Sequence, residues 1–257
     1  MTVLADGEFG DYRRGVFRYY EEKRYNEALA VAREAFRRFP ESDAMTSFWI
    51  ACLQNRLGNH DEAIQTLQSA VGRGIWWPTG TLQDSDLDSI RDSPDFRTIE
   101  EECKRLQQQA PKIGKPELMV RVPTDYSDGR DYPALVVFHA RYGERPEISA
   151  EEWLPVASTG TILAAPWSSQ MYASDGRCWD DPEVSERDVK WTFEQLGARY
   201  RLNPERLVLG GFSQGGALSI YSALKRVVAE GGDNHRREGS LLSQDRATVC
   251  VDGGEGS

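Results

Sequence analysis

The segment that decides the fold reads Arg206-Leu207-Val208-Leu209-Gly210-Gly211-Phe212-Ser213-Gln214-Gly215-Gly216. Residues 206–209 form a short apolar run that is typical of a buried strand, and residues 217–224, Ala-Leu-Ser-Ile-Tyr-Ser-Ala-Leu, predict a helix. A serine on the sharp turn between a strand and a helix projects its hydroxyl above the sheet, where it can act as a nucleophile. Glycines on both sides allow the backbone to approach its neighbours where a Cβ atom would clash. The segment therefore predicts Ser213 as a nucleophile.

The rest of the C-terminal half alternates between strand and helix patterns. Residues 118–122 alternate like a half-buried strand, whereas residues 134–138 and 161–165 are continuous apolar runs, typical of strands buried on both faces. This alternation predicts a mostly parallel α/β sheet. The other parts of the pattern are a helical apolar stripe at Val189, Phe193, Leu196 and Tyr200, a break at Asn203-Pro204 before the strand at Leu207, and a candidate last strand at residues 248–251.

The N-terminal half is helical and carries an internal repeat. Ala63 follows Ala28 by 35 residues, and each of these alanines comes after a polar turn and begins an apolar stripe at helical spacing. The distance is close to the period of about 34 residues of tetratricopeptide repeats. The region resembles about two such repeats, in which alanines let paired helices approach closely, and it predicts an α-helical repeat domain with a protein or peptide partner. The stripes are Leu29, Ala32, Phe36 and Phe39 in the first repeat and Leu67, Ala70 and Val71 in the second.

Helix start signals and a linker complete the N-terminal half. Asn59 with Glu62 has the spacing of an N-cap and its N3 acid, and Ser93 with Pro94 has the N-cap and first-turn positions of a later helix. Paired prolines and a glycine in residues 110–116 predict a linker. The predicted domains are a helical domain at residues 1–110, a linker at residues 111–116 and an α/β domain at residues 117–257.

Three segments of the α/β domain carry a family resemblance. The most specific is Gly211-Phe212-Ser213-Gln214-Gly215-Gly216-Ala217, and the others are Pro166-Trp167-Ser168-Ser169-Gln170 and Cys178-Trp179-Asp180-Asp181. On these motifs the domain resembles an α/β-hydrolase of the phospholipase/carboxylesterase group, which includes acyl-protein thioesterases. The resemblance covers about residues 115–224, and the tail at residues 225–257 diverges from it. It implies a partial α/β-hydrolase sheet and hydrolysis of a carboxylic ester or thioester.

The resemblance also implies roles for individual residues. Ser213 would attack the carbonyl carbon, and the backbone N–H of Gln214 would hold the resulting oxyanion. A second N–H is expected from the loop after residue 138, where the family carries His-Gly and this chain has His139-Ala140-Arg141. Arg141 occupies the position that resembles the family's second oxyanion donor. Ala140 replaces the family's glycine, and this departure affects the backbone dihedral angles that the loop can adopt. We interpret His139 as ordering this loop, because the base normally follows the serine in chain order.

Further polar and aromatic residues lie on loops that follow strands, where such folds place ligand contacts. These residues are Ser169, Gln170, Trp179 and Asp180. In one interpretation Ser169, Gln170 and Trp179 line the pocket for the acyl or leaving group and bind the substrate. In the other, they only order the loops that carry them.

The acid and the base of a catalytic triad are not evident after Ser213. His235 is the only histidine there, and it lies in a polar, glycine-rich stretch without periodicity. Asp233 is too close to His235 for the two to occupy separate loops, and neither Asp245 nor Asp252 has a histidine after it. A complete hydrolase sheet also needs more residues than this domain provides. We therefore expect a truncated or frame-shifted hydrolase.

Composition restricts the classes of partner and location. The 257-residue chain has a formal charge of −10 and no concentrated basic tract, which argues against nucleic acid as a partner. No apolar run approaches the roughly 20 residues of a membrane helix, and no signal peptide is evident. Four scattered cysteines without a C-x-x-C pair indicate reduced thiols in a cytoplasmic protein. We expect no metal and no cofactor, and we interpret the acidic residues 84–88 as a solvated turn rather than a calcium loop.

These observations leave three functions open. In the first, the chain is a serine esterase or thioesterase that acts on a small-molecule substrate, with helical repeats that bind a partner. In the second, it is a catalytically inactive interaction protein. In the third, it is an incomplete gene product that lacks the acid and the base of the triad.

Overall fold

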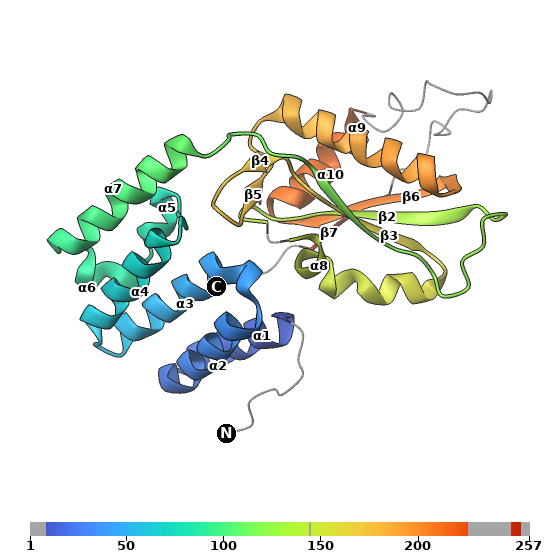
Figure 1. The fold of residues 1–257 in the computed structure, drawn as a ribbon. Helices are drawn as coiled ribbons and strands as arrows, with labels where there is room; N and C mark the ends of the chain where they lie inside the picture. The colour runs from blue at the N-terminus through green and yellow to red at the C-terminus, as the bar shows by residue number, and fades with distance from the viewer. Residues whose placement is uncertain (1–8, 144, 226–247, 253–257) are drawn as a thin grey trace. The chain divides into compact units, whose positions relative to one another are not determined.

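The chain folds into two compact units (Figure 1). In this computed structural model the first unit is helical and the second is built on a β-sheet. The first comprises Met1–Pro111 with Ala173–Asp175, and the second comprises Lys112–Tyr172 with Gly176–Ser257. The residues that the structure describes are 9–143, 145–225 and 248–252.

Helices joined by short turns make up the first unit. They are α1 (Phe9–Glu21), α2 (Tyr25–Arg38), α3 (Asp43–Arg56), α4 (His60–Gly72), α5 (Thr79–Leu82), α6 (Asp88–Arg91) and α7 (Pro94–Gln109), with the 3₁₀ turns η1 (Pro40–Ser42) and η2 (Ser85–Leu87). Successive helices from α1 to α4 pack against one another, and α7 packs against α4. The unit is therefore a stack of helix-turn-helix pairs closed by α7.

Small side chains allow these helices to pack closely. Ala28 and Ala32 of α2 are fully buried, as are Ala63 and Ala70 of α4. Their burial follows the helical spacing predicted from the sequence, because side chains three or four residues apart share one face of a helix. The tetratricopeptide-like character of the two pairs stays a prediction.

Only one of the two predicted N-caps is confirmed. The Ser93 hydroxyl accepts a hydrogen bond from the backbone N–H of Phe96 at 3.2 Å, and Pro94 is the first residue of α7. Asn59 precedes α4 as expected, but its side chain makes no capping hydrogen bond. Glu62, the predicted partner in that cap, instead accepts a hydrogen bond from α3.

The second unit is a mixed sheet covered by helices. Its elements are β1 (Glu117–Arg121), β2 (Tyr132–Phe138), α8 (Pro146–Ser149), η3 (Glu151–Thr159), β3 (Ile162–Trp167), β4 (Gln170–Met171), β5 (Arg177–Cys178), α9 (Pro182–Arg199), β6 (Leu202–Phe212), α10 (Gln214–Leu224) and β7 (Thr248–Asp252). The strand order is β1-β3-β2-β6-β7, with β1 antiparallel to β3 and the other neighbours parallel. This partly parallel sheet fits a partial α/β-hydrolase, and β7 confirms the candidate last strand.

Alternate residues of β2 supply the cores on the two faces of the sheet. Val136 and Phe138 pack on the side of α9 and α10, whereas Leu135 and Val137 pack on the side of η3. Figure 1 shows α9 and α10 on one side of the sheet and α8 on the other. Because both faces are covered, the strand reads as a continuous apolar run rather than an alternating one. The predicted helical stripe of α9 belongs to the first of these cores through Val189, Phe193 and Leu196.

The structure corrects the predicted break at Asn203-Pro204. Both residues lie inside β6, where the pairing with β2 shifts between Tyr132 and Ala134. A proline cannot donate a ladder hydrogen bond, so it is tolerated at such an irregularity. Among the described helices, none combines the length and apolar character needed to cross a bilayer.

Candidate active site

The carboxyl ends of β2 and β6 meet in the middle of the sheet. Val137 pairs with Gly210 and Phe138 pairs with Gly211, so the loops that follow the two strands start side by side. The chain leaves β2 for β3 on one side and later crosses to β6 on the other, which makes this position the topological switch point. Open α/β sheets bind ligands in the crevice at such a point.

Ser213 occupies a strained turn between β6 and α10. Its backbone has φ 51° and ψ −117°, and the residue is exposed. A positive φ costs a residue with a side chain about 1–3 kcal/mol, which the surrounding structure must offset. Because α10 begins directly afterwards at Gln214, the backbone N–H groups of its first turn have no partners within the helix. They are donors available beside the serine.

Glycines are required on both sides of this turn. A Cβ atom on Gly211 would lie 2.5 Å from the carbonyl oxygen of Phe138, and one on Gly215 would lie 2.0 Å from the same oxygen. Both distances are far shorter than a carbon–oxygen contact permits, and the obstacle is the backbone of β2, which cannot rotate away. The two glycines therefore let β6 and α10 approach the loop after β2.

The loop after β2 contains a second strained residue. Tyr142 has φ 59°, whereas Ala140, at the predicted departure from the family pattern, is not among the residues with positive φ. The conformational difficulty expected at Ala140 thus lies two residues further along the loop, at Tyr142. Arg141, the predicted second oxyanion position, lies directly before the strained tyrosine.

His139 is buried behind this loop. The backbone N–H of Ser168 donates to its Nε2 at 3.1 Å, and its Nδ1 lies 2.7 Å from the carbonyl oxygen of Ala140. The first bond identifies Nε2 as the acceptor, so Nδ1 carries the proton and donates to the carbonyl. The ring also stacks on Trp179 with centroids 4.7 Å apart. Burial lowers the pKa of His139 to about 4, so the ring is neutral.

These contacts support the interpretation of His139 as a loop-ordering residue. Both ring nitrogens already have partners, so neither is free to take a proton from Ser213. Gly143 is fitted to the same ring, because a Cβ atom there would lie 1.9 Å from Nδ1 of His139. The histidine thus fills the space beneath the loop.

Trp179 and Asp180 connect the two loops of the switch point. The backbone N–H of Trp179 donates to Oε1 of Gln214 at 3.0 Å, and its indole N–H donates to the carbonyl oxygen of His139 at 3.1 Å. Asp180 accepts from Nε2 of Gln214 at 2.7 Å and from Arg141 at 2.5 Å. The structure therefore brings together five of the residues named from the sequence.

Ser169 and Gln170 are buried, and their polar groups bind internal partners. Asp188, almost fully buried, accepts hydrogen bonds from the backbone N–H and the hydroxyl of Ser169 at 2.7 and 2.8 Å. The side-chain amide of Gln170 exchanges two hydrogen bonds with the backbone of Asp181 and donates a third to Ser185. These contacts favour the loop-ordering interpretation for both residues. The anchoring aspartate had no local signal in the sequence.

Most of the residues weighed as an acid or a base after Ser213 cannot be located in the described part of the chain. Asp233, His235 and Asp245 lie outside the described residues. Asp252 is the last residue of β7, which pairs with β6 at Phe212. No histidine occurs in α10 or β7, the parts described after the serine. The described site thus contains a strained serine and candidate oxyanion donors, but no assigned base.

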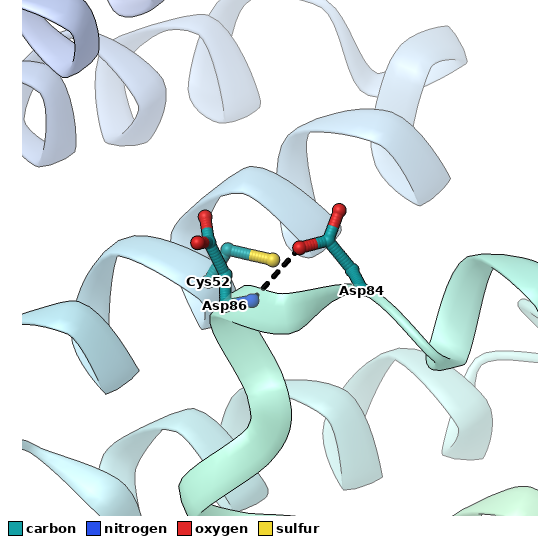
Figure 2. A group of neighbouring side chains, drawn as sticks. All are labelled: Cys52, Asp84 and Asp86. Atoms are coloured by element: carbon teal, nitrogen blue, oxygen red, sulfur yellow. Dashed lines mark hydrogen bonds between the residues drawn. The ribbon is translucent and has the colours of Figure 1, made fainter.

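A separate cluster of potential ligands lies in the helical unit (Figure 2). The sulfur of Cys52 and carboxylate oxygens of Asp84 and Asp86 lie within 4.8 Å of one another. Burial and the two carboxylates raise the pKa of the Cys52 thiol well above its ordinary value. Asp84 accepts from the backbone N–H of Asp86 at 2.8 Å. Through this bond the Asp84 side chain caps the 3₁₀ turn η2.

Asp86 corrects the sequence interpretation of residues 84–88 as a solvated turn. Its exposed fraction is 8%, and its carboxylate accepts from the Tyr20 hydroxyl at 2.8 Å and forms an ion pair with Arg56. Burial and the hydrogen bond to Asp86 raise the pKa of Tyr20 to about 12. The carboxylate therefore fastens the turn to α1 and α3.

Replacing Asp86 with alanine is expected to lower the free energy of unfolding by about 2 kcal/mol, because Tyr20 and Arg56 lose their shared acceptor. Urea unfolding followed by circular dichroism measures this loss. Asp88→Ala is the matched control, since that side chain is exposed and pairs with Arg91 of the same short helix. Equal stability of the two variants would contradict the structural role of Asp86.

Comparison with known proteins links the helical unit to hydrolases. Residues 14–111 match the family described as "A/B hydrolase-like, N-terminal domain", which is less than half of the chain. No curated protein matches. Together with the sheet topology, the family match supports a relationship to α/β-hydrolases.

Solved structures show only distant similarity. An uncharacterized protein from Bacillus cereus ATCC 10987 is 23% identical with a TM-score of 0.39, and the match covers 86% of this chain and 70% of that one. The apo form of Thermogutta terrifontis esterase 2 is 19% identical with a TM-score of 0.34, and the match covers 40% of this chain and 39% of that one. The same esterase phosphonylated by cyclosarin gives 19% identity and a TM-score of 0.34, covering 40% of each chain. This chain thus spans about two fifths of the esterase.

Proposed function

We propose that the second unit is a serine hydrolase domain that acts on carboxylic esters or thioesters, with Ser213 as nucleophile. The observation that carries the proposal is the backbone of Ser213, held at φ 51° between two glycines that cannot accept a Cβ atom. Strain of this kind persists where the surrounding structure enforces it, commonly at catalytic positions.

The proposed reaction follows acyl-transfer chemistry. The Ser213 oxygen attacks the carbonyl carbon, its proton passes to a base, and the carbonyl oxygen becomes an oxyanion. The backbone N–H of Gln214 and a second N–H at Arg141 stabilise that charge. The oxyanion then collapses and expels the alcohol or thiol, and water releases the acid from the acyl-serine. By chain order the base follows the serine, and His235 is the one histidine there.

The residues predicted to bind substrate take a different part in this proposal. Ser169 and Gln170 use their polar groups on internal partners, and Trp179 is buried against His139. We propose that these three residues shape the site from behind rather than contact the acyl group. The substrate contact surface then consists of the exposed side of the two loops at the switch point.

Hydrolysis of p-nitrophenyl acetate and butyrate by the purified chain tests the proposal. Ser213→Ala is expected to lower kcat/KM by about 10³-fold or more, since the nucleophile is lost. The matched control is Ser222→Ala on the same helix. Its buried hydroxyl has no hydrogen-bond partner in the described part of the chain, so the change leaves activity and stability in place. Labelling of Ser213 by a fluorophosphonate probe gives an independent readout.

The second candidate function is that of a catalytically inert interaction protein whose helical unit binds a partner. The observation that favours it is that both ring nitrogens of His139, the histidine in the loop after β2, already have hydrogen-bond partners. In that case the wild-type chain and Ser213→Ala hydrolyse both esters at the same rate, and the probe labels neither. The same assay therefore separates the two candidates.

A further inference from the structure

One carboxylate bridges the two segments that flank the proposed oxyanion site. Oδ2 of Asp180 accepts from the Arg141 guanidinium at 2.5 Å, and Oδ1 accepts from the side-chain amide of Gln214 at 2.7 Å. Arg141 belongs to the loop after β2, and Gln214 is the first residue of α10. Asp180 belongs to neither segment, since it lies between β5 and α9.

The oxygen of the Gln214 amide is held by Trp179, the residue before Asp180. Its Oε1 accepts from the backbone N–H of Trp179 at 3.0 Å, so both polar atoms of the side chain are bound by one dipeptide. The indole N–H of Trp179 also donates to the carbonyl oxygen of His139. The dipeptide therefore fixes both the start of the oxyanion loop and the start of α10.

These contacts of Asp180 fix the positions of the two segments but add little to the free energy of folding. The side chains of Arg141 and Asp180 are 55% and 42% exposed, and ion pairs with that exposure contribute little to the free energy of folding. Burial alone would raise the pKa of Asp180, but hydrogen bonds from Arg141 and Gln214 lower it below its ordinary value. The carboxylate thus stays charged and keeps both donors in place at neutral pH.

We propose that Asp180 is a positioning residue that holds the loop after β2 and the start of α10 in register, and so sets the distance between the two oxyanion donors. The assignment rests on the proposed function for its catalytic consequence. A misplacement of about 1 Å at such a site costs on the order of 10²-fold in rate. Removing the bridge should therefore affect turnover far more than folding.

The first test compares Asp180→Ala with Asp181→Ala, its neighbour in the chain. Asp181 caps α9 through bonds to the N–H groups of Glu183 and Val184, so its loss lowers the melting temperature by about 2–4 °C but leaves kcat unchanged. Asp180→Ala is expected to lower kcat for p-nitrophenyl butyrate by about 10–100-fold, with KM within about twofold and the melting temperature nearly unchanged. Wild-type kcat in Asp180→Ala would overturn the proposal.

A second measurement does not depend on activity. Hydrogen exchange of the full chain, read by mass spectrometry, should be about tenfold faster in Asp180→Ala at both residues 139–143 and residues 213–217, but not in Asp181→Ala. Unchanged exchange in both segments would overturn the bridge itself. If Ser213→Ala matches the wild type in hydrolysis, the proposed function fails, and the exchange result alone then decides whether Asp180 couples the two segments.

Discussion

Gly215→Ala is expected to lower the free energy of unfolding of the second unit by about 3 kcal/mol or more. The added methyl group would lie 2.0 Å from the carbonyl oxygen of Phe138 and 2.6 Å from that of His139. Both obstacles are backbone atoms at the end of the central strand β2, so relief requires the sheet or α10 to move. Calorimetry of the full chain should show the transition of this unit about 6 °C lower or more.

Gly197→Ala supplies the control for that prediction. This glycine lies within α9, and a Cβ atom there would meet nothing within 4 Å apart from its own helix. Alanine is favoured over glycine in a helix by about 0.5–1 kcal/mol, so this variant should be slightly more stable than the wild type. If both substitutions raised the melting temperature, the close approach of α10 to β2 would be refuted.

The elements around this contact could be predicted because their signals are local. The continuous apolar runs are buried on both faces of the sheet at residues 134–138 and 162–165, and the elbow follows from glycines close to Ser213 in the sequence. The position of Pro204 inside a strand could not be predicted. A proline usually ends a strand, but here the irregular pairing of β6 with β2 accommodates it, and that pairing depends on a distant segment.

The candidate site was less predictable than the sheet, because its contacts join residues far apart in the sequence. Asp180 reaches Arg141 and Gln214 across 39 and 34 residues, and no periodic pattern connects such positions. Ser169 and Gln170 were singled out by their place after a strand, which indicates proximity to the site but not the direction of the side chain. Their inward direction depends on Asp188 and Ser185 of α9, which accept hydrogen bonds from Ser169 and Gln170 and are brought next to them only by folding.

Acid is expected to destabilise the second unit through His139. Its pKa is about 4 in the folded protein against an ordinary value of 6.5, because burial disfavours the charged ring. Between these values the unfolded chain binds a proton that the native state does not, so the free energy of unfolding falls as the pH drops from 6.5 to 4. Over the full interval from pH 6.5 to pH 4, the free energy of unfolding falls by about 3 kcal/mol. Above pH 6.5 this contribution is constant.

Denaturant unfolding at pH 7, 6, 5 and 4.5 measures this loss, and His139→Gln isolates it from the carboxylates that titrate nearby. Glutamine keeps an acceptor for the Ser168 N–H and a donor for the Ala140 carbonyl but has no group that titrates in this range. Its free energy of unfolding should therefore fall less steeply with acid than that of the wild type. His60→Gln, which lies in the helical unit and retains His139, is the matched control for the loss of a histidine. Parallel curves for the wild type and His139→Gln would show that the buried ring does not control the acid response.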